Sequence, residues 1–128
     1  MIDFGVTERE SSSHRRGVVN FLSRFKAFAS KNGVVVFQRQ DYKETLTELA
    51  IHPSQAKEMI LGLTVENYYK GLGPGERDGE EVCELGVVDN GREIYIKLII
   101  DNTHEQAICC SFHFPKREIE YPFAEDVG

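Results

Sequence analysis

The chain has 128 residues, three cysteines and a formal net charge of −6, and 41% of its residues are hydrophobic. This length predicts one domain with one core, and no apolar run approaches the ~20 residues of a membrane-spanning helix. We therefore expect a cytoplasmic protein without a secretory signal, a disulfide framework, a cofactor or a membrane partner.

Charge is distributed unevenly along the sequence. Residues 1–40 contain seven basic and three acidic side chains, whereas residues 41–128 contain eight basic and eighteen acidic ones. Nucleic-acid-binding domains are usually basic overall, so the total argues against an RNA partner, while the basic N-terminal third argues for one. Two ordinary solvated surfaces would explain the same distribution.

Helical periodicity is strongest in the first half of the sequence. Apolar residues recur every three or four positions between His14 and Lys31, which predicts a helix ended by Asn32-Gly33. Residues 1–13 and 118–128 are expected to be loosely ordered ends of a single domain. Three more helical segments are predicted: Tyr42–Ala50 with an Asp41–Glu44 capping box, one that begins at Pro53, and Val65–Lys70 ended by Gly71.

Strand signals dominate the second half. A short strand is predicted at 34–37, and residues 72–80 are rich in glycine and charge, which predicts a loop. Strands follow at 82–88 and 92–100, joined by an Asp89-Asn90-Gly91 hairpin turn, and at 107–115. We therefore expect an α+β fold, with an N-terminal helix, a short strand and further helices packed on a three-strand antiparallel meander.

The last two strands place polar side chains opposite apolar ones. Side chains alternate along a strand, so the predicted apolar faces are Ile94, Ile96, Leu98 and Ile100 in one strand, and Ile108, Cys110, Phe112 and Phe114 in the next. The opposite faces carry Tyr95, Lys97, Ser111 and His113. Pairing the strands predicts a phenol, an ammonium, a hydroxyl and an imidazole on one surface.

These groups can perform proton-transfer and phosphoryl-transfer chemistry. His113 can accept or donate a proton, Lys70 and Lys97 can neutralise a phosphate, and Tyr95 can orient or protonate a phosphate oxygen. Glu84, on the preceding strand, is a candidate base or a partner for a nucleobase edge. Taken singly, each side chain is more often an ordinary surface or packing residue. No metal-ligand spacing is present, so no metal is expected.

Four segments of the sequence resemble the MqsR family of toxins from type II toxin–antitoxin systems. They are LTELAIHPSQAKEMILGLTVENYYKG (46–71), VCELG (82–86), REIYIKL (92–98) and AICCSFHFP (107–115). The resemblance implies a RelE-like ribonuclease fold, metal-independent cleavage of mRNA and neutralisation by a cognate antitoxin. It also implies functional roles for Lys70 and Tyr95. His113 stands where the best-known member has a lysine, and Glu84 lies near the position of a family glutamine.

We therefore expect an endoribonuclease toxin that cleaves mRNA by attack of the substrate's own 2′-hydroxyl. His113 would act as acid or base, Glu84 as the second proton-transfer group, and Lys70, Lys97 and Tyr95 would stabilise or orient the phosphate. The antitoxin and mRNA are the expected partners, with the ribosome as a further candidate. The alternative is a non-catalytic protein-interaction module that binds its partner through basic residues of the first helix: Arg15, Arg16, Arg24, Lys26 and Lys31.

Overall fold

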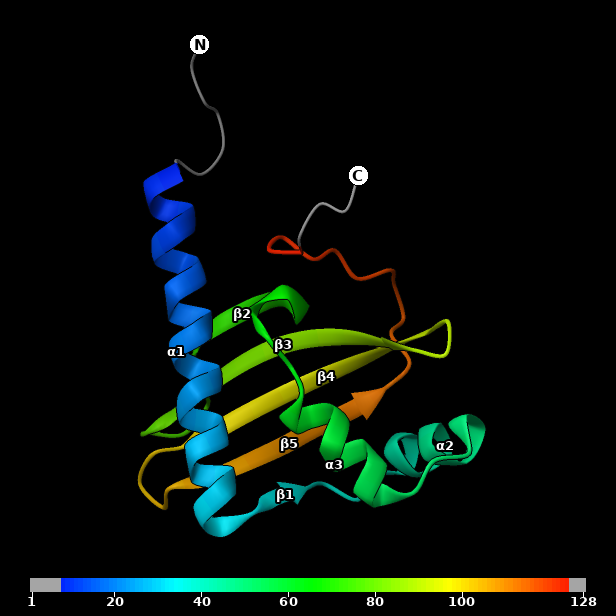
Figure 1. The fold of residues 1–128 in the computed structure, drawn as a ribbon. Coiled ribbons are helices and arrows are strands. Elements are labelled where there is room, and N and C mark those ends of the chain that lie inside the picture. The colour runs from blue at the N-terminus through cyan, green and yellow to red at the C-terminus, as the bar shows by residue number, and fades with distance from the viewer. Residues whose placement is uncertain (1–7, 125–128) are drawn as a thin grey trace.

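A computed structural model describes residues 8–124, and the side chains of residues 12–124. Helical elements, with one short strand among them, occupy the first half and strands follow one another in the second, which confirms an α+β fold (Figure 1). The elements are α1 (Glu8–Asn32), β1 (Val34–Val36), α2 (Gln40–Leu49), α3 (Pro53–Leu61), the 3₁₀ helix η1 (Val65–Asn67), β2 (Tyr68–Pro74), β3 (Glu80–Asp89), β4 (Arg92–Asp101) and β5 (Gln106–His113).

The strands form a five-stranded mixed sheet in the order β1-β5-β4-β3-β2. Strands β2 to β5 are antiparallel neighbours, so the meander has one strand more than the three predicted. The predicted hairpin turn between β3 and β4 is confirmed, and Asn90 and Gly91 both have positive φ, at 53° and 82°. Such a turn matches the right-handed twist of the flanking strands. Strand β1 adds a parallel edge to β5.

The predicted helical segment from Val65 to Lys70 is wrong beyond Asn67. The Asn67 side chain accepts a hydrogen bond from the Thr64 N–H at 2.9 Å and donates one to the Gly86 carbonyl at 3.0 Å. These contacts hold a single turn against β3, and the chain then pairs with β3 as strand β2. Because β2 continues to Pro74 and β3 begins at Glu80, the predicted loop at 72–80 shortens to residues 75–79.

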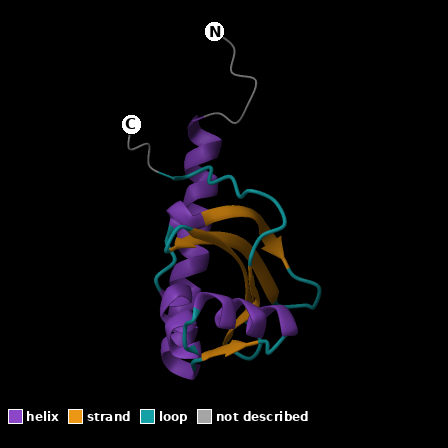
Figure 2. Ribbon diagram, turned by 90° about the vertical axis from the view of Figure 1, so that its right-hand side faces the viewer, coloured by secondary structure: helices purple, strands orange, loops and turns teal. Residues whose placement is uncertain are grey.

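Helices α1 and α3 lie on one face of the sheet, which Figure 2 shows from the side. The alternating residues of β4 on this face, Ile94, Ile96, Leu98 and Ile100, are fully buried. Facing them is the predicted stripe of α1, with Val18, Phe21, Leu22 and Phe25. Burial of each large apolar side chain contributes about 1.5–3 kcal/mol, so this layer stabilises the fold.

The helix boundaries differ from the predicted ones at two N-termini. Helix α1 begins at Glu8, so residues 8–13, predicted to be loose, are helical, and residues 1–7 lie outside the described part. The predicted Asp41–Glu44 capping box is wrong, because α2 begins at Gln40 after the N-cap residue Arg39. The Asp41 side chain is thereby released from capping and lies in the first turn of α2.

A β-bulge in β5 changes which side chains share a face. Ser111 pairs with Lys97 and Cys109 pairs with Leu98, so Cys110 is the extra residue. As a result Cys109 joins the core, while Ile108 and Cys110 lie on the opposite face. The predicted common face of Ile108, Cys110 and Phe112 is therefore wrong, because a bulge shifts the alternation by one residue.

We call the sheet surface opposite α1 the open face, and Tyr95, Lys97 and Ile99 mark it on β4. All three side chains are partly exposed, whereas their neighbours on the other face are fully buried. Among the described residues, no helix has the length and apolar character needed to cross a membrane.

Candidate functional site

Three of the predicted site residues meet on neighbouring strands of the open face. Tyr95 on β4 pairs with His113 on β5 and with Gly86 on β3, next to Glu84. The Tyr95 hydroxyl donates a hydrogen bond to Glu84 Oε1 at 2.7 Å, and the Tyr95 and His113 rings lie 5.1 Å apart between centroids. The strand register alone therefore brings a phenol, a carboxylate and an imidazole together.

The Tyr95 phenol remains protonated at neutral pH. Burial raises the pKa of Tyr95 far above its ordinary value of 10.0, and the hydrogen bond to the Glu84 carboxylate raises it further. A carboxylate is a better acceptor when it is ionised, and it favours the neutral phenol as donor. Tyr95 is thus suited to donate a hydrogen bond and not to act as a general base.

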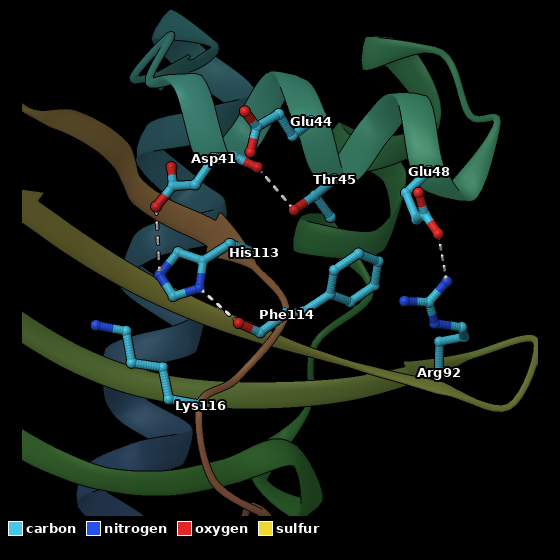
Figure 3. A pocket seen from close by; sticks show the side chains of 8 residues that line it. All are labelled: Asp41, Glu44, Thr45, Glu48, Arg92, His113, Phe114 and Lys116. Carbon is cyan, nitrogen blue, oxygen red and sulfur yellow. Dashed lines mark hydrogen bonds and ion pairs between the residues drawn. The ribbon is translucent and has the colours of Figure 1, made fainter.

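The two nitrogens of His113 have different surroundings (Figure 3). Nδ1 lies 2.9 Å from the carbonyl oxygen of Phe114, and because a carbonyl only accepts, Nδ1 carries the proton. Nε2 faces Asp41 on α2, with 3.8 Å between Nε2 and Oδ2. This fixed tautomer leaves Nε2 as the nitrogen that can exchange a proton with a bound molecule.

A cavity of about 220 Å³, here called the Tyr95 pocket, collects these groups. It is lined by Tyr69, Lys70, Glu84, Tyr95, His113, Pro115, Lys116 and Arg117. Four of the five predicted site residues therefore share one pocket. Within the described residues, the three cations Lys70, Lys116 and Arg117 take part in none of the ion pairs, so their charge is available to an anion.

Lys70 was predicted to lie in a helical segment. It instead reaches the Tyr95 pocket from strand β2. Lys70 lies opposite Glu84 in the β2–β3 register. A bulge between Tyr68 and Lys70 turns Tyr69 toward the same pocket. The Lys70 ammonium lies 4.8 Å from the centroid of the Tyr69 ring. A cation over an aromatic face is held electrostatically, which limits the positions that this long side chain visits.

Gly71 allows the Glu84 carboxylate to take its place. Gly71 has φ +80°, and a Cβ atom built on it would overlap Glu84 Oε2. A side chain here would be strained by the backbone and would displace the carboxylate. The glycine was predicted as a helix stop, but it serves as a space for Glu84.

Lys97 lies beside the Tyr95 pocket without lining it. It pairs with Glu84 on one side and Ser111 on the other, and its side chain lines a separate groove of about 270 Å³, here called the Lys97 groove. The groove is lined by Phe37, Arg39, Glu76, Arg77, Glu80, Val82, Lys97, Ile99, Asp101, Ile108 and Cys110.

Asp41 is a site residue that the sequence analysis missed. It belongs to a second cavity of about 530 Å³ that shares His113 and Lys116 with the Tyr95 pocket. Figure 3 shows Asp41, Glu44 and Glu48 of α2 on one side of this cavity and Arg92, Phe114 and Lys116 on the other. The sequence contained no signal for it, because Asp41 has an equally good local explanation as a helix cap.

The segment after β5 forms a wall of the Tyr95 pocket and is anchored by Glu93. The Glu93 carboxylate accepts hydrogen bonds from the Ile119 N–H at 3.0 Å and from the Tyr121 hydroxyl at 2.9 Å. Ile119 is 4% exposed and, with Tyr121, rests against Gly86, where a Cβ atom would come within 2.6 Å of both side chains. This anchoring positions Lys116 and Arg117, although 118–128 was expected to be loose; residues 125–128 lie outside the described part.

Within the described residues, no three His, Cys, Asp or Glu side chains cluster closely enough to hold a metal ion. Comparison with family models, with curated proteins and with solved structures found no significant match for this chain. The arrangement of the Tyr95 pocket is therefore the basis for assigning a function.

Proposed function

We propose that this protein is a metal-independent endoribonuclease with a RelE-like fold, and the mRNA-cleaving toxin of a toxin–antitoxin pair. The observation that supports this most directly is the convergence of Glu84, Tyr95 and His113 with unpaired cations around one pocket. Cleavage of a phosphodiester needs a base, an acid and positive charge near the phosphorus. The pocket offers all three, and the resemblance to the MqsR family points to the same chemistry.

The proposed reaction begins with attack of the substrate's 2′-hydroxyl on the adjacent phosphorus. Glu84 accepts the hydroxyl proton, since Tyr95 occupies Oε1 and leaves Oε2 available. The O2′–P bond forms as the bond from phosphorus to the 5′-oxygen breaks. His113, protonated on both nitrogens and paired with Asp41, gives its Nε2 proton to the leaving oxygen. The products are a 2′,3′-cyclic phosphate and a 5′-hydroxyl.

Positive charge and a fixed phenol stabilise the transition state in this mechanism. Lys70, Lys116 and Arg117 face the pocket from opposite walls and neutralise the extra charge that the phosphorus centre acquires. Tyr95 orients Glu84 through its hydrogen bond. Preorganised charges of this kind cost no rearrangement during the reaction, which is why they accelerate it.

The decisive experiment is incubation of the purified protein with single-stranded RNA in the presence of EDTA. We expect cleavage that leaves cyclic phosphate ends and that persists in the chelator, because no metal is used. RNA that stays intact, or cleavage that EDTA abolishes and magnesium restores, would overturn the proposed mechanism. RNA with 2′-O-methyl groups serves as the matched control and should not be cut.

The proposed toxin activity also predicts an effect on the growth of cells. Expression of the chain alone should stop growth, and co-expression of its antitoxin should restore it. A His113→Ala variant that arrests growth as strongly as the unmodified chain would favour the alternative, a non-catalytic protein-interaction module. The same assay with and without purified ribosomes would establish whether the ribosome is a partner.

A further inference from the structure

The Lys97 groove lies beside the Tyr95 pocket on the open face. Lys97 is two residues from Tyr95 along β4, so the two positions are about 7 Å apart at the usual strand rise. That spacing suits successive phosphates of an extended single strand. Lys97 also lies opposite Glu84 in the β3–β4 register, and Glu84 lines the Tyr95 pocket, so the two sites share a boundary.

Two cations converge at the end of the groove nearest the Tyr95 pocket. Lys97 and Arg39 both line the groove together with Cys110. Burial raises the pKa of this thiol, and the charges of the two cations oppose that shift. Within the described residues, neither Lys97 nor Arg39 takes part in an ion pair. Glu80 and Asp101, opposite each other on β3 and β4, lie at the other end, four residues further along β4. Glu76 and Arg77, from the loop before β3, also line the groove.

The floor and wall of the groove are apolar. Val82, Ile99 and Ile108 form neighbouring positions across β3, β4 and β5 and are partly exposed. Phe37 follows the edge strand β1, remains 39% exposed and has the Arg39 guanidinium 5.6 Å from its ring centroid. An exposed aromatic ring beside unpaired cations is the combination with which proteins bind single-stranded nucleic acids.

We propose that the Lys97 groove is a nucleotide subsite, in which Lys97 and Arg39 bind the phosphate next to the scissile one and Phe37 stacks on its base. This inference rests on the proposed action on RNA and extends it to a neighbouring nucleotide. It gives Lys97 a binding role instead of the catalytic role expected from the sequence. The acidic end of the groove repels a further phosphate, so the subsite accommodates one nucleotide.

The test measures binding of a fully 2′-O-methylated single-stranded RNA, which cannot be cleaved by the proposed route. The double variant Arg39→Ala/Lys97→Ala should bind more weakly, and the slope of log K against log salt should become shallower by about 0.7, the value for one phosphate of a single strand. Phe37→Ala should weaken binding about 5- to 100-fold without changing this slope, because stacking is uncharged. Lys57→Ala, at an exposed position of α3, is the control and should change neither quantity.

The outcomes separate the subsite from the catalytic proposal. If the double variant and Phe37→Ala bind the methylated RNA as the unmodified protein does, the subsite proposal is overturned, whether or not RNA is cleaved. If a glutamate-rich peptide loses affinity in these variants while RNA does not, the groove serves a protein partner and the proposal is also overturned. Binding that depends on these residues, in a protein that cuts no RNA, supports the subsite and contradicts the nuclease.

Discussion

His113 lies where two cavities meet, and its hydrogen bond to its neighbour's carbonyl decides which nitrogen is available. Because Nδ1 is held by Phe114, the proposed proton transfer would take place through Nε2, on the side of α2. The Tyr95–Glu84 hydrogen bond likewise makes the phenol the donor and the carboxylate the acceptor. Local hydrogen bonds thus assign the roles that residue types alone leave open.

Replacing His113 by alanine should lower the RNA cleavage rate by about 10²–10⁴, the usual contribution of a positioned proton-transfer group. The fold should persist, since the side chain is on the open face and partly exposed. The matched control is His104→Ala, in the β4–β5 turn. Single-turnover rates and circular dichroism measure both effects, and full activity of His113→Ala would contradict the assigned role.

Gly71→Ala should reduce cleavage by displacing Glu84, and it should also destabilise the protein by more than about 1 kcal/mol because of its positive φ. Gly73→Ala is the control on the same strand, where a Cβ atom meets nothing within 4 Å. Cleavage rates and urea unfolding separate the two effects. Equal activity of both variants would show that the position of the Glu84 carboxylate is unimportant.

At the scale of elements, α1 offers a smaller basic surface than its sequence indicates. Arg24 forms a two-pronged contact with Glu81, at 2.5 and 2.7 Å, and Lys31 pairs with Glu105. Both are therefore used to attach α1 to the sheet, Arg24 to β3 and Lys31 to the β4–β5 turn. Arg15 and Arg16 are exposed and remain available for a polyanionic partner.

The double reversal Arg15→Glu/Arg16→Glu should slow the association of RNA or of an acidic antitoxin segment, most strongly at low salt. Charge steering acts over a Debye length of about 10 Å at 0.1 M salt and is screened above it. Stopped-flow association rates at two salt concentrations provide the measurement. Rates that equal those of the unmodified protein for both partners would make this surface an ordinary solvated one.

Phe112→Ala should destabilise the protein by about 3–5 kcal/mol, because it opens a cavity where β5 meets α2. Phe112 is 1% exposed and its ring lies 5.8 Å from that of Tyr42, edge to face. Ser111→Ala, the preceding residue on the open face, should cost little. Urea unfolding measures both variants, and a similar small loss for each would mean that this end of the core is not tightly packed.

Local signals predicted some elements and missed others for identifiable reasons. The β3–β4 hairpin was predictable because Asn90-Gly91 and the alternation of β4 act within a few residues. Strand β2 was not, because its backbone is paired by β3 and its preceding turn is held by Asn67 on Gly86. The same holds for Asp41 and for the segment anchored by Glu93, since each depends on contacts between residues distant in the sequence.

At the scale of the whole molecule, unpaired cations gather at the proposed site although the chain is acidic overall. The chain has a net charge of −6, yet unpaired cations line both the Tyr95 pocket and the Lys97 groove. Association with a polyanion depends on the local potential more than on the total charge. The acidic total is therefore compatible with an RNA substrate.

The Arg24–Glu81 pair, which joins α1 to β3, should make stability depend on pH. The hydrogen bond from Arg24 lowers the pKa of Glu81 from its ordinary 4.5 to about 2. A lowered pKa in the folded state means that this stabilisation is present above pH 4.5 and is lost as pH falls toward 2. Glu81→Gln should thus lower the melting temperature at pH 7 and change it little near pH 2.

Glu105→Gln provides the control for this measurement, because the Lys31–Glu105 pair is more exposed and is expected to contribute less. A Glu81→Gln variant with the melting temperature of the unmodified protein at every pH would show that α1 is held by its apolar stripe alone.

The bulge in β5 also decides which of the two adjacent cysteines is shielded from oxidants in the core. Cys109 and Cys110 are neighbours in the strand, so the ordinary alternation sends their thiols to opposite faces, and they are not placed to form a disulfide with each other. The bulge places Cys109 in the core and Cys110 on the open face. Burial raises the pKa of Cys109 to about 12, which keeps it a thiol and not the reactive thiolate. Of two adjacent cysteines, the extra residue in the strand thus buries the one that an unbroken alternation would have left on the open face.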